Sequence, residues 1–286
     1  MLGAGARSLE RTIDVLADAR RVTNFLRGHL EFRPRADDVY VVTYPRSGTT
    51  WMQYMLHLLT TEGEIDFTHL GEVSPWYERS LAIGSMSAAD FERYDSPRVF
   101  KSHLPWGWLP QPGRYVYIWR DGRDVAVSYY HFYRSHLGFR GDFDAFFERF
   151  LRGDVQYGSW FRHVSGWQAH AEDPNVHVLT YEALTRDRAR ALSEVAAFCG
   201  IEADDARLQS VLERSTFEAM KTIEAKFDHT TAVLLERGMQ TRSFIRSGKV
   251  GSGELTLSSA QHQAFDRLAE RGDEPTRELN LPAFLH

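Results

Sequence analysis

Short β-branched hydrophobic runs alternate along the chain with longer stretches in which apolar residues recur at a helical period. The runs typical of buried strands lie at 39–43, 98–102, 114–119 and 176–180. Helical patterns begin at Thr49, at Asp124 as a predicted N-cap, and at Arg188. Because strands that alternate with helices form parallel sheets, we predict an α/β fold with a parallel sheet flanked by helices in three layers. Sites in such folds lie at the carboxyl ends of the strands.

The segments outside this alternation predict further helices and one loop-rich region. Residues 8–30 have a helical period and form most of a predicted N-terminal extension at 1–37. Residues 217–221 and 234–253 are predicted to be rich in loops, and residues 255–286 to form a helix and then irregular chain.

The turn after the first strand has the composition of an anion-binding loop. It leads into a helix whose free amides and positive dipole end attract an anion. Gly48 lets the backbone approach the anion, and Arg46 adds fixed positive charge. Hydroxyl donors come from Ser47, Thr49 and Thr50. The loop lacks the Gly-Lys pair of nucleotide-triphosphate loops, which argues against an ordinary ATP or GTP loop, and a turn that needs glycine only for its shape stays open.

A second candidate anion site follows the third predicted strand. Arg120 ends that strand, and Ser128 lies about one turn into the next helix, so both can face the same crevice. The alternative is an arginine that caps the edge of the sheet beside a solvent-facing serine. Two anion sites at neighbouring strand ends favour a doubly phosphorylated nucleotide as the ligand.

A candidate general base follows the second predicted strand. His103 lies between this strand and a proline, and a neutral imidazole can accept a proton from a hydroxyl at neutral pH. Lys101, two residues earlier, projects to the same side of an extended chain. A structural histidine remains the alternative.

The composition limits the class of partner and the compartment. A formal net charge of -5 argues against a nucleic-acid partner. With no run of eighteen apolar residues, we expect no membrane association. Cys199, the sole cysteine, lies in an apolar helical stretch, which indicates a buried thiol and a reducing cytoplasm. No repeat or linker interrupts the sequence, so we predict one domain over 1–286.

Three segments together resemble the cytosolic sulfotransferases, which use 3'-phosphoadenosine 5'-phosphosulfate (PAPS) as donor. TYPRSGTTW resembles the phosphosulfate loop of the family, KSHLP its catalytic-histidine segment, and RDGRDVAVSYYHFYR its 3'-phosphate segment. Further resemblances follow in the family's order: YGSWFRHVSGW, LTYEAL, STFEAMK and FIRSGKVG. The resemblance implies a P-loop NTPase-like sulfotransferase fold.

The resemblance also implies a role for each matched residue. The loop from Arg46 to Thr50 would hold the 5'-phosphosulfate, and Trp51 would stack on adenine. The rest of the adenine pocket would comprise Tyr181, Ser215 and Phe217. The 3'-phosphate would be bound by Arg120 and Ser128 and covered by Arg246, Ser247 and Gly248. Trp51 and Phe217 could equally be core aromatics.

The implied reaction is sulfuryl transfer to a hydroxyl of a small acceptor, without a metal. His103 would deprotonate the acceptor, while Arg46 and Lys101 stabilise the charge that develops on the leaving group. Two residues depart from the family pattern, because Arg46 and Ser247 stand where the family has lysine, although Lys249 lies nearby. An apolar or aromatic acceptor is expected from flanking side chains, namely Trp76, Tyr133, Phe139 and Met239. Aromatic residues at these positions could equally belong to the core.

Two other functions remain open from the sequence. One is a P-loop kinase or nucleotide hydrolase in which Asp121 binds magnesium. The other is a non-catalytic binder of the spent nucleotide, 3'-phosphoadenosine 5'-phosphate (PAP). The sequence leaves the oligomeric state undetermined.

Overall fold

Four parallel strands form the centre of the structure, a computed structural model that describes residues 2–61, 63–227, 245, 248 and 250–271, with side chains from residue 16 onward. The strands are β1 (Val39–Thr43), β2 (Val99–Ser102), β3 (Arg114–Trp119) and β4 (Val176–Thr180), in the spatial order β2-β1-β3-β4. The strand pattern predicted from the sequence is correct, and β2 begins one residue later than expected.

Helices connect and cover these strands. They are α1 (Leu2–Glu31), α2 (Thr49–Thr60), α3 (Tyr77–Ile83), α4 (Ala88–Phe91), α5 (Gly122–His136), α6 (Phe143–Arg152), α7 (Trp160–Gln168), α8 (Tyr181–Arg186), α9 (Arg188–Cys199), α10 (Asp205–Arg214), α11 (Phe217–Thr222), α13 (Ser252–Thr256) and α14 (Ser259–Arg271). Short 3-10 helices span Leu70–Glu72, Trp106–Trp108 and Glu224–Lys226.

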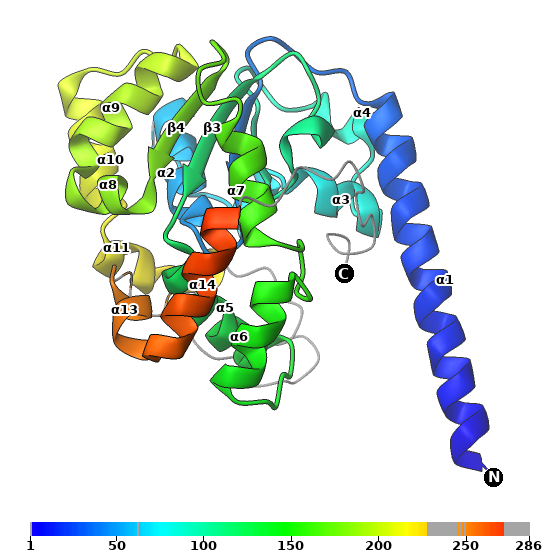
Figure 1. Cartoon of the computed structure of the whole chain (residues 1–286). Helices are drawn as coiled ribbons and strands as arrows, with labels where there is room; N and C mark the ends of the chain where they lie inside the picture. Colours follow the sequence, from blue (N-terminus) through cyan, green and yellow to red (C-terminus); the bar gives the residue numbers. More distant parts are fainter. Residues whose placement is uncertain (1, 62, 228–244, 246–247, 249, 272–286) are drawn as a thin grey trace.

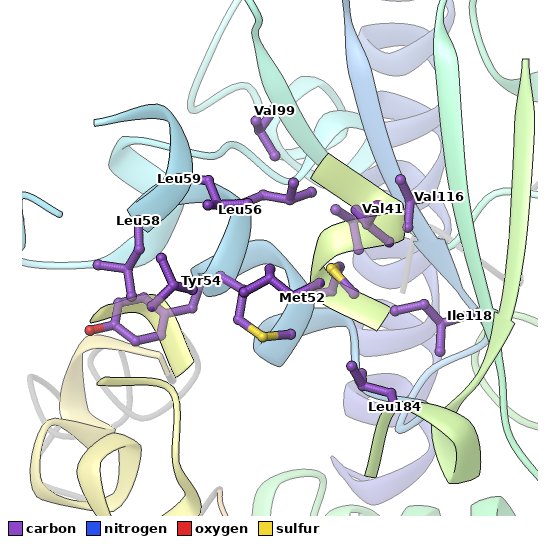
Figure 2. Close-up of a cluster of buried hydrophobic side chains, with 14 of the residues drawn as sticks. Val41, Met52, Tyr54, Leu56, Leu58, Leu59, Val99, Val116, Ile118 and Leu184 are labelled. Atoms are coloured by element: carbon purple, nitrogen blue, oxygen red, sulfur yellow. The ribbon is translucent and has the colours of Figure 1, made fainter. Parts of the chain in front are cut away.

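One face of the sheet packs against α2, α8 and α9, and α10 packs on α2 and α9. Alternate residues of β1, Val39 and Val41, point to this face and are fully buried. They meet apolar side chains of α2, among them Met52 and Leu56, and Figure 2 shows this cluster between the helix and the sheet. The packing fixes the position at which α2 starts, directly after the turn that follows β1.

The other face packs against α1, α3, α4 and α7. Here Tyr40 lies between Phe100 and Tyr115 of the neighbouring strands, with ring centroids 5.3 and 5.5 Å apart and nearly parallel planes. Phe25 of α1 is fully buried in the same cluster, and the start of α1 projects away from the body of the molecule. The sheet therefore has helices on both faces, which is the predicted three-layer arrangement (Figure 1).

Two local predictions are wrong. The N-cap of α5 is Asp121, whose carboxylate accepts the Arg123 amide at 2.7 Å; Asp124 lies inside the first turn instead. The region expected to be loops contains α11, because the Thr216 hydroxyl accepts the Ala219 amide at 3.1 Å and caps a helix. Its last two residues also begin α13, while 234–244 and 272–286 lie outside the described residues.

Among the helices described, none has both the length and the apolar character needed to cross a bilayer.

Candidate active site

The carboxyl ends of all four strands meet one cavity. Arg46 follows β1, His103 follows β2, Arg120 follows β3 and Tyr181 follows β4. All four residues line the cavity, whose volume is about 880 Å³. Parallel strands end at a single edge of the sheet, which is where doubly wound folds bind their ligands. The structure thus brings together residues that the sequence distributes over four separate segments.

The turn between β1 and α2 offers backbone amides to this cavity. Gly48 has a φ of 100°, and a Cβ atom at this position would lie 2.9 Å from the Tyr181 ring, so a residue without a side chain is required. The first backbone hydrogen bond of α2 runs from the Trp51 amide to the Gly48 carbonyl at 3.1 Å. The amides before Trp51 therefore precede the helical ladder and can bind an anion together with the helix dipole.

Arg46 links this turn to the second predicted anion site. Its Nε donates to Ser128 Oγ at 3.2 Å, and its carbonyl accepts a hydrogen bond from Arg120 at 3.3 Å. Its φ of 70° is uncommon for a residue with a side chain, and such strained positions cluster at functional sites. The two anion sites predicted separately thus form one continuous cluster of Arg46, Arg120 and Ser128.

Arg120 also anchors the segment that follows Gly248. Its guanidinium pairs with Asp124 at 3.2 Å, and the same carboxylate accepts the amides of Gly251 and Gly253 at 2.9 and 2.6 Å. The Tyr181 hydroxyl donates to the Gly248 carbonyl at 3.1 Å. Asp124, wrongly predicted as an N-cap, therefore connects the segment 251–253 to Arg120 at the cavity. Arg246, Ser247 and Lys249 lie outside the described residues.

Aromatic rings and a further arginine complete this side of the cavity. Trp51 and Tyr181 lie edge to face with centroids 6.1 Å apart, and Trp51 Nε1 donates to the Ser215 carbonyl at 2.8 Å. Phe217 is 37% exposed and lines the cavity, so it is not a core residue. Arg188, which sequence reasoning missed, lies with its guanidinium carbon 5.9 Å from the Trp51 ring centroid.

Two of the residues predicted to bind the nucleotide, among those that the structure describes, do not line the cavity. Ser47 and Ser215 are fully buried, and the hydroxyl oxygen of each has no hydrogen-bond partner among the described residues. Any contact of Ser47 with an anion in the cavity therefore involves its backbone amide rather than its hydroxyl.

His103 is held as a neutral imidazole with one basic nitrogen available. Nδ1 lies 2.7 Å from the Thr43 carbonyl, so it carries the proton and donates it, which leaves Nε2 as the acceptor. Burial, and next the positive charge of Lys101, lower the pKa of His103 well below its ordinary value. The side chain can therefore accept a proton at neutral pH. Thr43 was not identified from the sequence, because its only signal is its position at the end of β1.

The peptide groups of His103 are fixed from both sides. Its amide donates to Glu78 Oε1 at 2.9 Å, and its carbonyl accepts from His163 Nε2 at 3.2 Å. Glu78 also accepts Trp76 Nε1 at 2.6 Å, and the Trp76 ring meets the imidazole edge to face at 5.1 Å. Lys101 Nζ lies 3.7 Å from the centroid of the same indole. Trp76 therefore contacts both the candidate base and the lysine.

Comparison with known proteins assigns this arrangement to a family. The profile described as "Sulfotransferase domain" matches residues 36–277. Human sulfotransferase 2A1 is 32% identical over 248 residues, which cover 83% of this chain and 85% of the relative. Rabbit amine sulfotransferase is 30% identical over 249 residues, covering 83% and 81%. The chain belongs to the sulfotransferase family.

Solved structures agree with this sulfotransferase assignment. Mouse sulfotransferase SULT7A1 complexed with PAP has a TM-score of 0.70 and 27% identity, with 93% of each chain covered. Retinol dehydratase in a complex with androsterone and PAP has a TM-score of 0.72 at 22% identity, a likeness that concerns the fold. The predicted family, the predicted enzyme class of sulfotransferase and the predicted α/β fold are confirmed.

The far part of the cavity corrects one expectation about the sulfotransferase acceptor site. Trp76 lines the cavity as predicted, together with Tyr157, whose ring lies 6.2 Å from it at an interplanar angle of 17°. Tyr133 and Phe139 do not line the cavity. Both rings pack on Phe146 of α6, with centroids 5.0 and 5.8 Å away, because the side of α5 that carries Tyr133 and the chain that follows α5 pack on α6. Met239 lies outside the described residues.

The residue on which the kinase alternative depends has a structural function. Asp121 caps α5 and forms an ion pair with Arg123 at 3.3 Å. Across residues 2–61, 63–227, 245, 248 and 250–271, no group of three or more histidine, cysteine or acidic residues has the arrangement of a metal site.

Proposed function

We propose that the chain transfers the sulfuryl group of PAPS to a hydroxyl of a small, apolar or aromatic acceptor, with His103 as the general base. PAPS as the co-substrate is confirmed, because the chain belongs to the family and mouse SULT7A1 was solved with PAP. The observation that carries the role of His103 is its tautomer: Nδ1 is committed to Thr43, and Nε2 remains a basic nitrogen at the end of β2.

The nucleotide fits one half of the cavity, which we call the nucleotide end. Its members are Arg46, Gly48, Thr49, Thr50, Trp51, Arg120, Ser128, Tyr181, Arg188, Phe217 and Gly248. Guanidinium groups and first-turn amides supply donors for two phosphate groups, and the rings of Trp51 and Tyr181 supply apolar surface for a base. We assign the 5'-phosphosulfate to the turn before α2 and the 3'-phosphate to Arg120 and Ser128.

The other half, which we call the acceptor end, is lined by Trp76, Arg79, Ile83, Met86 and Tyr157. His103 lies between the two ends, in contact with both Trp76 and Tyr157 at centroid distances of 5.1 and 5.0 Å. A hydroxyl group of an acceptor bound among these side chains would face Nε2, the free nitrogen of the base. Aromatic and aliphatic walls favour an apolar body for that acceptor.

The chemistry follows from the charges at the junction. As the acceptor oxygen bonds to sulfur, His103 Nε2 takes the hydroxyl proton, and the bond from sulfur to the 5'-phosphate oxygen breaks. Negative charge develops on that bridging oxygen, and Lys101, Arg46 and the amides before Trp51 stabilise it. A phosphate leaving group needs no proton at neutral pH, so the permanently charged Arg46 can replace the lysine usual in the family.

An activity assay tests this proposal. Sulfur-labelled PAPS is incubated with a panel of phenols, alicyclic alcohols and primary amines, the last because a relative is named amine sulfotransferase. His103→Ala is expected to lower kcat by about a hundredfold to ten-thousandfold, the range for loss of a general base, with unchanged affinity for PAP. His262→Ala, on α14 and away from the cavity, is the matched control.

Two results would contradict the proposal. Full turnover in His103→Ala would remove histidine as the base. PAP binding without turnover of any acceptor would favour a non-catalytic nucleotide binder.

We further infer one cytoplasmic domain over 1–286. The inference is supported by the lone Cys199, which is buried and whose thiol pKa is raised by burial to about 12.

A further inference from the structure

Cationic side chains outnumber carboxylates around the cavity. Among the described residues, its charged lining consists of Arg46, Arg79, Arg93, Lys101, Arg120, Arg188 and a single carboxylate, Glu72. Three of the arginines belong to the nucleotide end, and Lys101 lies beside the base. PAPS, which carries several negative charges, explains why those four cations line the cavity. Arg79 and Arg93 remain, and both lie on the acceptor side of the cavity.

These two remaining arginines differ in their surroundings. Arg93 pairs with Asp90 at 3.0 Å, and its side chain is 74% exposed, so its charge is already compensated. Arg79, on α3, is partly buried and forms neither an ion pair nor a hydrogen bond with any residue that the structure describes. Glu72 forms no ion pair with Arg79 among the described residues, and its carboxylate accepts the Thr68 amide at 3.0 Å.

Arg79 and the candidate base His103 both contact the ring of Trp76. Its guanidinium carbon is 5.3 Å from the centroid of the Trp76 ring, and the centroid of the His103 imidazole is 5.1 Å from that ring. Trp76, Arg79 and His103 also line the same cavity, so one small acceptor packed beside Trp76 would have the imidazole and the guanidinium as its two polar neighbours. Among the described residues the guanidinium donors of Arg79 are unpaired, and a carboxylate matches the geometry of a planar guanidinium.

We propose that Arg79 selects acceptors that carry a carboxylate, so that the preferred substrates are small hydroxylated aromatic or alicyclic acids. The proposal rests on the proposed sulfuryl transfer for the position of the hydroxyl. It assigns the apolar body of the acceptor to Trp76, Met86 and Tyr157, and its anionic group to Arg79. The alternative is that Arg79 only stacks on the indole and takes no part in binding.

Binding to the PAP-loaded protein tests this assignment without any need for turnover. Calorimetric titrations compare three hydroxy acids of increasing length, 4-hydroxybenzoate, 4-hydroxyphenylacetate and 3-(4-hydroxyphenyl)propionate, each with its uncharged methyl ester. We expect at least one acid to bind about tenfold more tightly than its ester, as for a partly buried charge-assisted pair. Arg79→Gln is expected to abolish this preference while ester binding stays within about twofold, and Arg79→Lys to keep part of it.

Arg93→Gln is the matched control, since it removes a paired arginine from the same side of the cavity. The assignment is overturned if every ester binds as tightly as its acid, if Arg79→Gln keeps the preference for the acid, or if Arg93→Gln abolishes it. Turnover of the same compounds with labelled PAPS is measured in parallel. A preference for the acid without turnover would contradict the proposed reaction while supporting the role of Arg79.

Discussion

The nucleotide end and the acceptor end of the cavity are built in different ways. Arg46, Arg120 and Tyr181 each lie within three residues of a strand's last residue, so the sheet itself positions them. Trp76 and Arg79 lie instead on the long connection between α2 and β2. Under the proposed function, the sheet therefore positions the residues that bind the sulfuryl donor, whereas the residues that bind the acceptor lie on connections that can change without disturbing the sheet. Substitutions at the two ends should accordingly affect different substrates.

The largest effect in this comparison is expected at the nucleotide end. Arg120→Ala removes a charged donor from the proposed 3'-phosphate site, and hydrogen bonds to charged groups contribute about 1.5 to 3 kcal/mol. We expect PAP to bind roughly tenfold to a hundredfold more weakly by calorimetry, with the relative rates for different acceptors unchanged. Arg190→Ala, on the exposed side of α9, is the control. A changed order of acceptors with normal PAP affinity would reverse the assignment of the two ends.

At the acceptor end we expect a smaller effect, which concerns the acceptor and leaves nucleotide binding unchanged. Trp76→Phe loses the hydrogen bond from Nε1 to the buried Glu78 and part of the ring under Lys101. We expect kcat/KM for the acceptor to fall by about tenfold, with unchanged affinity for PAP. Trp106→Phe serves as control, because Trp106 stacks on His170 and does not line the cavity. Weakened PAP binding in Trp76→Phe would mean that the acceptor end also contributes to nucleotide binding, which contradicts the division of the cavity into two ends.

The smallest effect concerns pH, at the junction of the two ends. The proposed reaction requires neutral His103, and burial together with Lys101 holds its pKa well below the ordinary 6.5. As the pH falls from 8 to 6.5, the imidazole therefore stays unprotonated. We expect kcat/KM for PAPS, measured with a non-titrating alcohol, to change by less than about twofold over that range. A tenfold decrease would indicate that the base has a normal or raised pKa.

Local patterns were enough to predict the features that depend on short stretches of sequence. The strand before Arg46 and the turn around Gly48 combine hydrophobic period, glycine and hydroxyl residues within a few positions, and the structure has this strand and turn. The ends of the strands before His103 and Arg120 were found in the same way. Their assigned roles in binding and catalysis remain predictions.

Features that arise from tertiary contacts were not predicted. Thr43 and His103 are 60 positions apart, and Glu78 reaches the His103 amide from 25 positions away, so no local pattern reports either contact. Tyr133 and Phe139 were placed near the acceptor because they are aromatic, but the sequence does not show which face of α5 meets α6. The N-cap predicted at Asp124 is wrong because Asp121, three residues earlier, has the same side chain and suits that position equally well.

A crystal structure of the chain with PAP bound tests the central claim most directly. The account predicts the 5'-phosphate on the amides of the turn before α2, the 3'-phosphate on Arg120 and Ser128, and the open acceptor end beside Nε2 of His103. PAP bound in the reverse direction, or with either phosphate away from these groups, would contradict it.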